Sequence, residues 1–192
     1  MNSIHVALTV LLTTVSCFAQ GQVYFANRVG AGGTVLNAPV AITGFQEGPG
    51  PDFSAQLLLQ GADGSLTPLT PISTFHPKGT GAAAISSMYW EPKVVDVPGI
   101  FGGQSATFVV RAWKTSFGSY DAAVASASGA FGASEAFVAT VGGEATDPGI
   151  PPYPPSYLLT LKAFNVGLIP EPSTITIGLL GAAALVAFRG NR

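Results

Sequence analysis

Residues 105–113 read SATFVVRAW, and the alternation of their side chains indicates the fold class. One face of this extended segment would be wholly apolar and would carry Ala106, Phe108, Val110 and Ala112. The opposite face would be half polar and would carry Thr107, Val109, Arg111 and Trp113. A period of two with β-branched and aromatic residues is typical of a strand that buries one face. The segment therefore predicts a sheet with a core on one side.

Similar runs recur along the chain and are separated by clusters of glycine and proline. Strand patterns occupy residues 22–28, 53–60, 135–141 and 156–164, and further candidates occupy residues 38–42, 69–74, 82–89 and 92–97. The dipeptide Asp63-Gly64, shortly after residues 53–60, is a hairpin signal. Residues 120–131 fit either a helical turn or a loop. Short strands between turn signals predict an all-β fold, an antiparallel β-sandwich of Ig-like or jelly-roll style.

The composition of the chain excludes some classes of function. Only 9% of its 192 residues are charged, 47% are apolar, and the net charge is -2. Nucleic-acid binding needs clustered Lys and Arg, and here these residues are scattered, so we expect no nucleic-acid partner. The single cysteine, Cys17, lies near the N-terminus. The remainder of the chain therefore has no thiol for a disulfide or a zinc–cysteine site.

The first residues have the pattern of an export leader. Residues 6–16 form an apolar run of the length of a signal-peptide h-region, and small residues follow at Cys17 and Ala19. We expect cleavage after Ala19. Two alternatives remain open. Cys17 would be acylated in a lipoprotein, although Thr14 stands where that signal has an aliphatic residue, or the leader would stay uncleaved as an anchor.

The C-terminal residues have the pattern of a short membrane helix. Residues 174–188 carry no charge, and as a helix they would span about 22 Å of a hydrocarbon core that is about 30 Å thick. Pro172 suits the first turn of a helix, and the helix dipole favours Glu171 beside it. Arg189 and Arg192 would lie on the cytoplasmic side. The alternative is a buried C-terminal helix of the domain.

The same segment resembles a known sorting signal. Pro170, Glu171, Pro172 and Ser173, followed by an apolar helix with glycines and by terminal arginines, closely resemble the PEP-CTERM sorting domain over residues 166–192. The resemblance implies recognition by an exosortase, a membrane-embedded transpeptidase-like protease. That protease is expected to cut near Pro-Glu-Pro and to pass the protein to the cell surface or the extracellular matrix. The basic tail is thinner than is usual in the family.

These patterns divide the chain into five segments. We expect a signal peptide at 1–19, a β-sandwich domain at 20–144, a proline-rich connector at 145–155, the last strand at 156–165 and the sorting signal at 166–192, with a transmembrane helix at about 174–188. The connector either crosses one end of the sandwich or stiffens the approach to the membrane. The body also resembles short exported proteins with a FANR-like first strand, here at residues 25–28. That likeness implies no activity.

Patterns of catalysis and metal binding are sparse. His76 is the only histidine after the leader, no G-x-S-x-G elbow accompanies it, and one histidine without cysteine cannot anchor zinc. Lys78 precedes the glycines of KGTG, unlike the lysine of a P-loop. The candidate carboxylates, almost all in expected loops, are Glu47, Asp52, Asp63, Glu91, Asp96, Asp121, Glu135 and Glu144. They form no array typical of calcium sites or glycosidases, although calcium remains an open alternative. We expect no cofactor, no metal and no enzyme activity.

The aromatic residues are the remaining indication of a ligand. Trp113 shares a predicted face with Arg111 and Thr107, and an exposed tryptophan can stack on a sugar ring. The alternative places Trp113 under a loop, against Arg111 as a cation–π pair. Trp90 is expected to cap the core.

These observations predict an exported, non-enzymatic protein of the cell envelope or extracellular matrix, held by its C-terminal helix before processing. Its partners would be the export machinery, an exosortase-type protease, the membrane and an extracellular polysaccharide. The alternatives are a carbohydrate-binding surface domain built on Trp113 and a secreted hydrolase built on His76 and scattered acids.

Overall fold

The computed structural model describes residues 20–31, 34–126, 129–147 and 149–168. The expected leader, with Cys17 and Ala19, lies outside these residues. So does the expected sorting signal from residue 169 onward, with Pro170, Glu171, Pro172, Ser173, the apolar residues 174–188, Arg189 and Arg192. Within the described residues, no helix is both long enough and apolar enough to cross a membrane.

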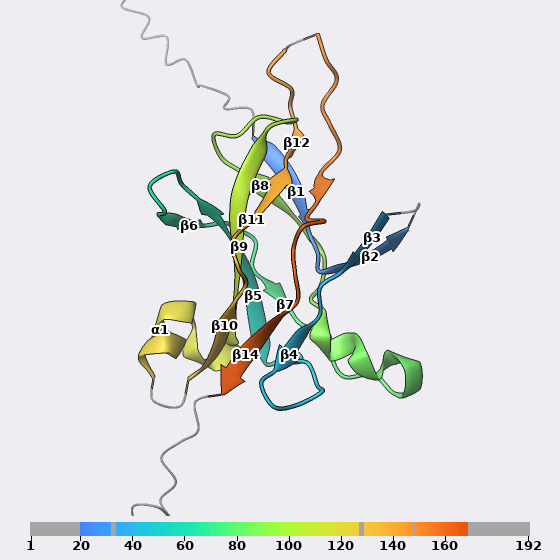
Figure 1. Cartoon of the computed structure of the whole chain (residues 1–192), viewed down its shortest axis with the longest axis vertical. Coiled ribbons are helices and arrows are strands. Elements are labelled where there is room, and N and C mark those ends of the chain that lie inside the picture. Colours follow the sequence, from blue (N-terminus) through green and yellow to red (C-terminus); the bar gives the residue numbers. More distant parts are fainter. Residues whose placement is uncertain (1–19, 32–33, 127–128, 148, 169–192) are drawn as a thin grey trace, which may run out of the picture.

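The described chain is all-β, with short helices between some strands (Figure 1). Its strands are β1 (Gly21–Phe25), β2 (Arg28–Ala31), β3 (Thr34–Asn37), β4 (Val40–Ile42), β5 (Phe53–Gln60), β6 (Leu66–Pro68), β7 (Ser73–Thr74), β8 (Lys93–Val97), β9 (Ser105–Lys114), β10 (Ala130–Ala133), β11 (Phe137–Thr140), β12 (Gly142–Gly143), β13 (Ser156–Tyr157) and β14 (Phe164–Leu168). The helices are α1 (Tyr120–Ala125) and two 3-10 helices, η1 (Gly81–Met88) and η2 (Thr115–Phe117).

Strand β9 is central to the larger sheet, whose strand order is β4-β14-β10-β9-β5-β6. All eight residues of β5 pair antiparallel with β9. Strands β10 and β11 follow each other along the opposite side of β9. Ser134 closes the gap between them, because its amide donates to the Val110 carbonyl and its hydroxyl accepts from the Val110 amide. The segment SATFVVRAW is therefore paired on both sides, as the central strand of a sheet must be.

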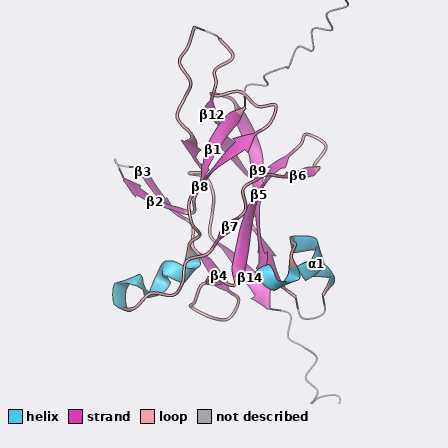
Figure 2. Ribbon diagram, turned by 180° about the vertical axis from the view of Figure 1, so that it is seen from behind, coloured by secondary structure: helices cyan, strands magenta, loops and turns pink. Residues whose placement is uncertain are grey.

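The smaller sheet is built around β1. Strand β8 runs antiparallel along one side of β1 over all five residues. The other side is shared by two short strands, β12 in antiparallel and β13 in parallel. Strand β14 also runs parallel to β4, so the expected antiparallel arrangement has exceptions at two strand pairs. Strands β2 and β3 form a separate two-stranded hairpin, visible from both sides of the molecule (Figures 1 and 2).

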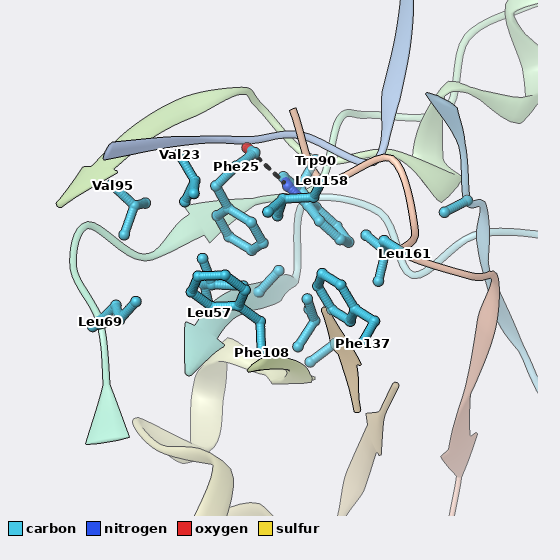
Figure 3. Packing of buried hydrophobic residues seen from close by; sticks show 14 of the residues in the cluster. Val23, Phe25, Leu57, Leu69, Trp90, Val95, Phe108, Phe137, Leu158 and Leu161 are labelled. Carbon is cyan, nitrogen blue, oxygen red and sulfur yellow. Dashed lines mark hydrogen bonds between the residues drawn. The ribbon is translucent and has the colours of Figure 1, made fainter. Parts of the chain in front are cut away.

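One hydrophobic core lies between the two sheets (Figure 3). Val23 and Phe25 of β1 and Val95 of β8 point toward Leu57 of β5 and Phe108 of β9, and all five are fully buried. Each side chain of this size contributes about 1.5–3 kcal/mol when it leaves water. The predicted apolar face of β9 is confirmed as a core face, since the cluster includes Ala106, Phe108, Val110 and Ala112.

A buried polar corner around Asn27, just after β1, connects this part of the chain to Ala38 and to the Met88–Trp90 segment. Asn27 is fully buried, and its Nδ2 donates to the carbonyl oxygens of Ala38 at 2.9 Å and Met88 at 3.0 Å. Its Oδ1 accepts from the amide of Trp90 at 3.1 Å. The indole Nε1 of Trp90 donates to the Phe25 carbonyl oxygen at 3.2 Å (Figure 3). Trp90 is 1% exposed, which confirms that it caps the core.

The hairpin predicted at Asp63-Gly64 is confirmed. It connects β5 to β6, and Oδ1 of Asp63 accepts from the amide of Ser65 at 2.9 Å and from its hydroxyl at 2.6 Å. These two hydrogen bonds stabilise the carboxylate and hold the pKa of Asp63 below its ordinary value. Gly64 has a φ of 82°, a backbone conformation that glycine adopts without strain.

Two predicted strands are wrong, and of a third, residues 69–74, only Ser73–Thr74 form a strand. Residues 82–89 fall mostly in helix η1, which is consistent with their run of three alanines, since alanine favours helix. Residues 156–164 form no single strand, because the chain turns between β13 and β14. In that turn the Leu161 amide donates to the Leu158 carbonyl oxygen at 3.0 Å, and both leucines enter the core. Their spacing of three residues suits a turn, whereas a strand places alternate residues on one face.

The proline-rich connector folds back on itself before it reaches β13. Gly143 and Tyr153 exchange two backbone hydrogen bonds of 2.8 Å, one in each direction. The loop between them projects beyond β12 (Figure 2). The last strand, β14, extends to Leu168 and so crosses the boundary expected at residue 165. Of the two interpretations of residues 120–131, the helical one is confirmed at α1, whose first turn is capped by the hydroxyl of Ser119.

Candidate binding surface

Trp113 is not available to a ligand in this structure, because only 2% of it is exposed. Its ring meets the ring of Tyr120 edge to face, with centroids 6.5 Å apart. Tyr120 begins helix α1, which packs against β9 and β10. The alternative expected from the sequence placed Trp113 under a loop, and the structure does bury it, but under helix α1. A sugar ring would have to displace α1 to stack on this indole.

Arg111 makes its cation–π contact with Tyr120 instead of Trp113. Its guanidinium carbon lies 4.5 Å from the centre of the Tyr120 ring, and its Nη1 lies 3.6 Å from Oδ1 of Asp121. Burial raises the pKa of the Tyr120 hydroxyl, and the positive charge of Arg111 opposes that rise. Among the described residues, the indole Nε1 of Trp113 has no hydrogen-bond partner. These contacts hold α1 over the sheet and engage the Arg111 side chain of β9 with Tyr120 and Asp121 of that helix.

The groups expected for hydrolysis do not converge in the described part of the chain. Nδ1 of His76 lies 3.5 Å from Oε2 of Glu91, and both side chains are partly exposed. No hydrogen bond joins the His76 ring to a described serine. Lys78 pairs with Glu47, and Lys162 pairs with Glu135, at the surface. Across the described ranges, His, Cys, Asp and Glu form no group of three that could hold a metal ion.

The outer face of the smaller sheet carries an exposed aromatic pair. The parallel register of β1 and β13 places Tyr24 beside Tyr157. Their ring centroids are 5.4 Å apart and their planes meet at 85°. Tyr157 is 41% exposed and Tyr24 is half-buried. The edge-to-face contact restrains the orientation of both rings, so the pair is a rigid surface feature.

A polar pair lies beside the tyrosines on the same face. The register of β1 and β8 places Gln22 opposite Asp96 and Tyr24 opposite Val94. Nε2 of Gln22 donates to Oδ1 of Asp96 at 2.9 Å. Because side chains alternate along a strand, these residues point away from the core that Val23 enters. We call the set of Gln22, Tyr24, Val94, Asp96 and Tyr157 the tyrosine face.

A groove of about 620 Å³ adjoins the tyrosine face at Tyr157. One wall is β11, with Val138 and Thr140, and the other is the chain from residue 154 to residue 160. Val138 is 53% exposed and Leu159 is 54% exposed, so the groove is largely apolar and open to solvent. We call it the Tyr157 groove. Its volume lies within the usual range for sites that hold small ligands, about 300–1,000 Å³.

Part of this surface follows from the sequence. The alternation in residues 22–28 places Tyr24 away from the core, as observed. Tyr157 lies in residues 156–164, which were predicted to form a single strand and do not. Its parallel pairing with β1 produces no recognisable pattern in the sequence around it. The tyrosine face therefore depends on contacts between distant parts of the chain, which periodicity does not report.

Comparisons with known proteins add no assignment. No protein-family model, no curated protein and no solved structure was found to match this chain.

Proposed function

We propose that this protein is an exported, non-enzymatic component of the cell envelope or extracellular matrix, sorted by its C-terminal signal. The observation that carries the proposal is the order of three features at the C-terminus. Pro170, Glu171, Pro172 and Ser173 come first, the uncharged residues 174–188 follow, and Arg189 and Arg192 end the chain. The apolar leader ending at Ala19 adds a second signal with the same topology.

The partners follow from the two signals. The export machinery would read the leader, and an exosortase-type protease would read the Pro-Glu-Pro element while the C-terminal helix holds the protein in the membrane. A helix of about 22 Å is marginal as a permanent span, which suits a temporary hold before processing. The processed protein would then reside at the cell surface or in the extracellular matrix.

The body would be an antiparallel β-sandwich of Ig-like or jelly-roll style, modified by its two parallel strand pairs. Support comes from the two sheets that enclose a single core. The His76–Glu91 pair, on which a secreted hydrolase would be built, lies at the surface. A carbohydrate-binding role built on Trp113 has lost its basis, because that ring is buried.

The experiment follows the fate of the C-terminus. The full chain is produced in cells with and without an exosortase, and its C-terminal peptides are identified by mass spectrometry. We expect cleavage near Pro170-Glu171-Pro172 only in cells with the protease, and we expect Glu171→Ala to abolish it. Glu144→Ala, an exposed carboxylate of the body, is the matched control and should be processed normally. An intact tail in the presence of the protease, or normal sorting of Glu171→Ala, would reject the proposal.

A further inference from the structure

We propose that the tyrosine face and the adjoining Tyr157 groove bind a neutral polysaccharide. A pyranose ring has an apolar face of C–H groups and a rim of hydroxyls, and this surface offers a counterpart to each. The inference rests on the body of the protein and is independent of the sorting signal. The body could bind a glycan wherever the protein resides, and the sorting signal could act without it.

The aromatic pair supplies the stacking surface. Tyr157 is 41% exposed, and its edge-to-face contact with Tyr24 restrains its ring before any ligand arrives. Restraint of this kind lowers the entropy lost on binding, since the ring has little freedom left to lose. Val94, 45% exposed and directly opposite Tyr24, extends the apolar surface across β8. A sugar ring on Tyr157 would therefore meet an aromatic ring whose orientation is already restrained.

The polar pair supplies hydrogen-bonding groups farther along the same face. Gln22 is two residues from Tyr24 along β1, which in a strand is about 7 Å. Its amide and the Asp96 carboxylate are held together by the 2.9 Å hydrogen bond, and a carboxylate has several acceptor sites beyond the one already used. Strands β8 and β13 flank opposite sides of β1, so Asp96 lies across β1 from Tyr157. The hydroxyls of the next sugar unit in a chain, and not those of the unit stacked on Tyr157, could donate to these oxygens. The face thus offers stacking and hydrogen bonding to successive units of one polysaccharide.

The charge of the face selects a neutral ligand over an anionic one. No Lys, Arg or His of the described residues forms an ion pair with Asp96. Lys93 is close along β8, but it pairs with Phe25, whose side chain is in the core, so Lys93 lies on the other side of the strand. A phosphate or uronate beside Asp96 would meet a negative charge without compensation. Uncharged hydroxyls complement the carboxylate.

The same charge disfavours a second copy of the chain as the occupant. A symmetric dimer uses the same patch on both partners, so each copy would bring its Asp96 into the interface. Burying carboxylates without cations is unfavourable. The Tyr157 groove also suits an elongated ligand, because it continues from Tyr157 along β11 past Val138. A polysaccharide chain could extend from the tyrosine face into this groove.

Affinity electrophoresis of the full chain tests the inference. The protein is kept in a zwitterionic detergent without sugar headgroups and run in native gels that contain soluble β-glucan, dextran or the anionic polysaccharide alginate. We expect retardation by at least one of the two neutral polymers and none by alginate. No retardation by either neutral polymer, or retardation by alginate alone, would overturn the proposal.

Variants locate the binding site. Tyr157→Ala should weaken binding about tenfold or more, and Tyr157→Phe, which keeps the ring, should change it less than about threefold. Tyr153→Ala is the matched control, because Tyr153 is 42% exposed and lies outside the tyrosine face and the groove lining.

A second variant keeps the test valid if Tyr157→Ala fails to fold, as judged by circular dichroism. Asp96→Ala, which removes an exposed carboxylate of the same face, should then weaken binding as well. Binding unchanged in Asp96→Ala and Tyr157→Ala would overturn the proposal. A dimer in sedimentation that Tyr157→Ala abolishes, without glycan retardation, would assign the face to a second copy instead.

Discussion

Replacing Asn27 by alanine should destabilise the fold more than its small change in volume suggests. The side chain makes three hydrogen bonds to backbone groups at a fully buried site. Its loss leaves the Trp90 amide without an acceptor, which costs about 1–3 kcal/mol. The carbonyl oxygens of Ala38 and Met88 each lose a donor, at about 1 kcal/mol apiece. We expect the free energy of unfolding to fall by about 3–5 kcal/mol, a large fraction of the typical total of about 5–15 kcal/mol.

Urea-induced unfolding of the detergent-solubilised full chain, followed by tryptophan fluorescence, measures this loss. Trp90 and Trp113 are both buried and report the transition when they enter water. Asn37→Ala is the matched control, because Asn37 is exposed and makes one side-chain hydrogen bond, from the Tyr89 hydroxyl at 2.8 Å. It should cost about 1 kcal/mol or less. A loss below about 1 kcal/mol for Asn27→Ala would refute the account of this corner.

Asn27→Asp separates hydrogen bonding from side-chain size. The introduced carboxylate can still accept from the Trp90 amide, but when ionised it cannot donate to the two carbonyl oxygens. Burial beside those oxygens raises its folded-state pKa above the unfolded value. A raised folded pKa means that stability is greatest below the unfolded pKa and is lost as pH rises through the folded pKa. The variant should therefore be more stable in mild acid than at neutral pH, relative to the parent. A pH-independent difference would show that the site is not buried as described.

Two further predictions concern packing and titration. The Cβ of Gly132→Ala would lie 2.2 Å from the carbonyl oxygen of Asn165, so this substitution should cost about 2 kcal/mol or more in thermal unfolding. Gly30→Ala meets nothing within 4 Å and should change stability by less than about 0.5 kcal/mol; equal effects would contradict the packing of β10 on β14. Burial raises the pKa of Tyr120, so ultraviolet titration should show a tyrosine that ionises above the ordinary pKa of the side chain, and Tyr120→Phe should remove that phase. Because the folded pKa exceeds the unfolded one, stability should also fall as pH rises above about 10, less so in Tyr120→Phe.

The sequence predicts those parts of the fold whose structure is encoded locally. Strand β5 has the predicted bounds, β9 differs by one residue, and the Asp63-Gly64 turn joins two strands as expected. These segments combine a period of two with a strong turn signal, and no distant contact overrides them. The sequence leaves two placements of Trp113 open, because the alternation in β9 shows that Trp113 is on the half-polar face but does not show what covers that face. Helix α1 covers it, and α1 comes from residues 120–131, whose pattern fits both a helix and a loop.

The remaining parts depend on contacts that no local pattern reports. The parallel pairing of Tyr24 with Tyr157 joins opposite ends of the described chain. The β2–β3 hairpin lies in a glycine-rich stretch, where periodicity is weak. Apolar residues such as Leu158 and Leu161 are as common in strands as in buried turns, so the sequence does not distinguish the two. The structure shows a turn, with both leucines buried. The tyrosine face therefore emerges from topology, although each of its residues is visible in the sequence.

The central place of β1 has a consequence for the order of folding. This strand is synthesised before every segment that pairs with it, and its partners include residues 142–143 near the connector and residues 156–157 beyond it. Non-local pairings of this kind form slowly, because loop closure must precede the contacts. A nascent chain therefore cannot complete the pairing of its first strand until residues 156–157 have left the ribosome. Completion of the smaller sheet is therefore deferred until synthesis of the body is nearly finished, so an export machinery that acts during synthesis would meet an incompletely folded chain.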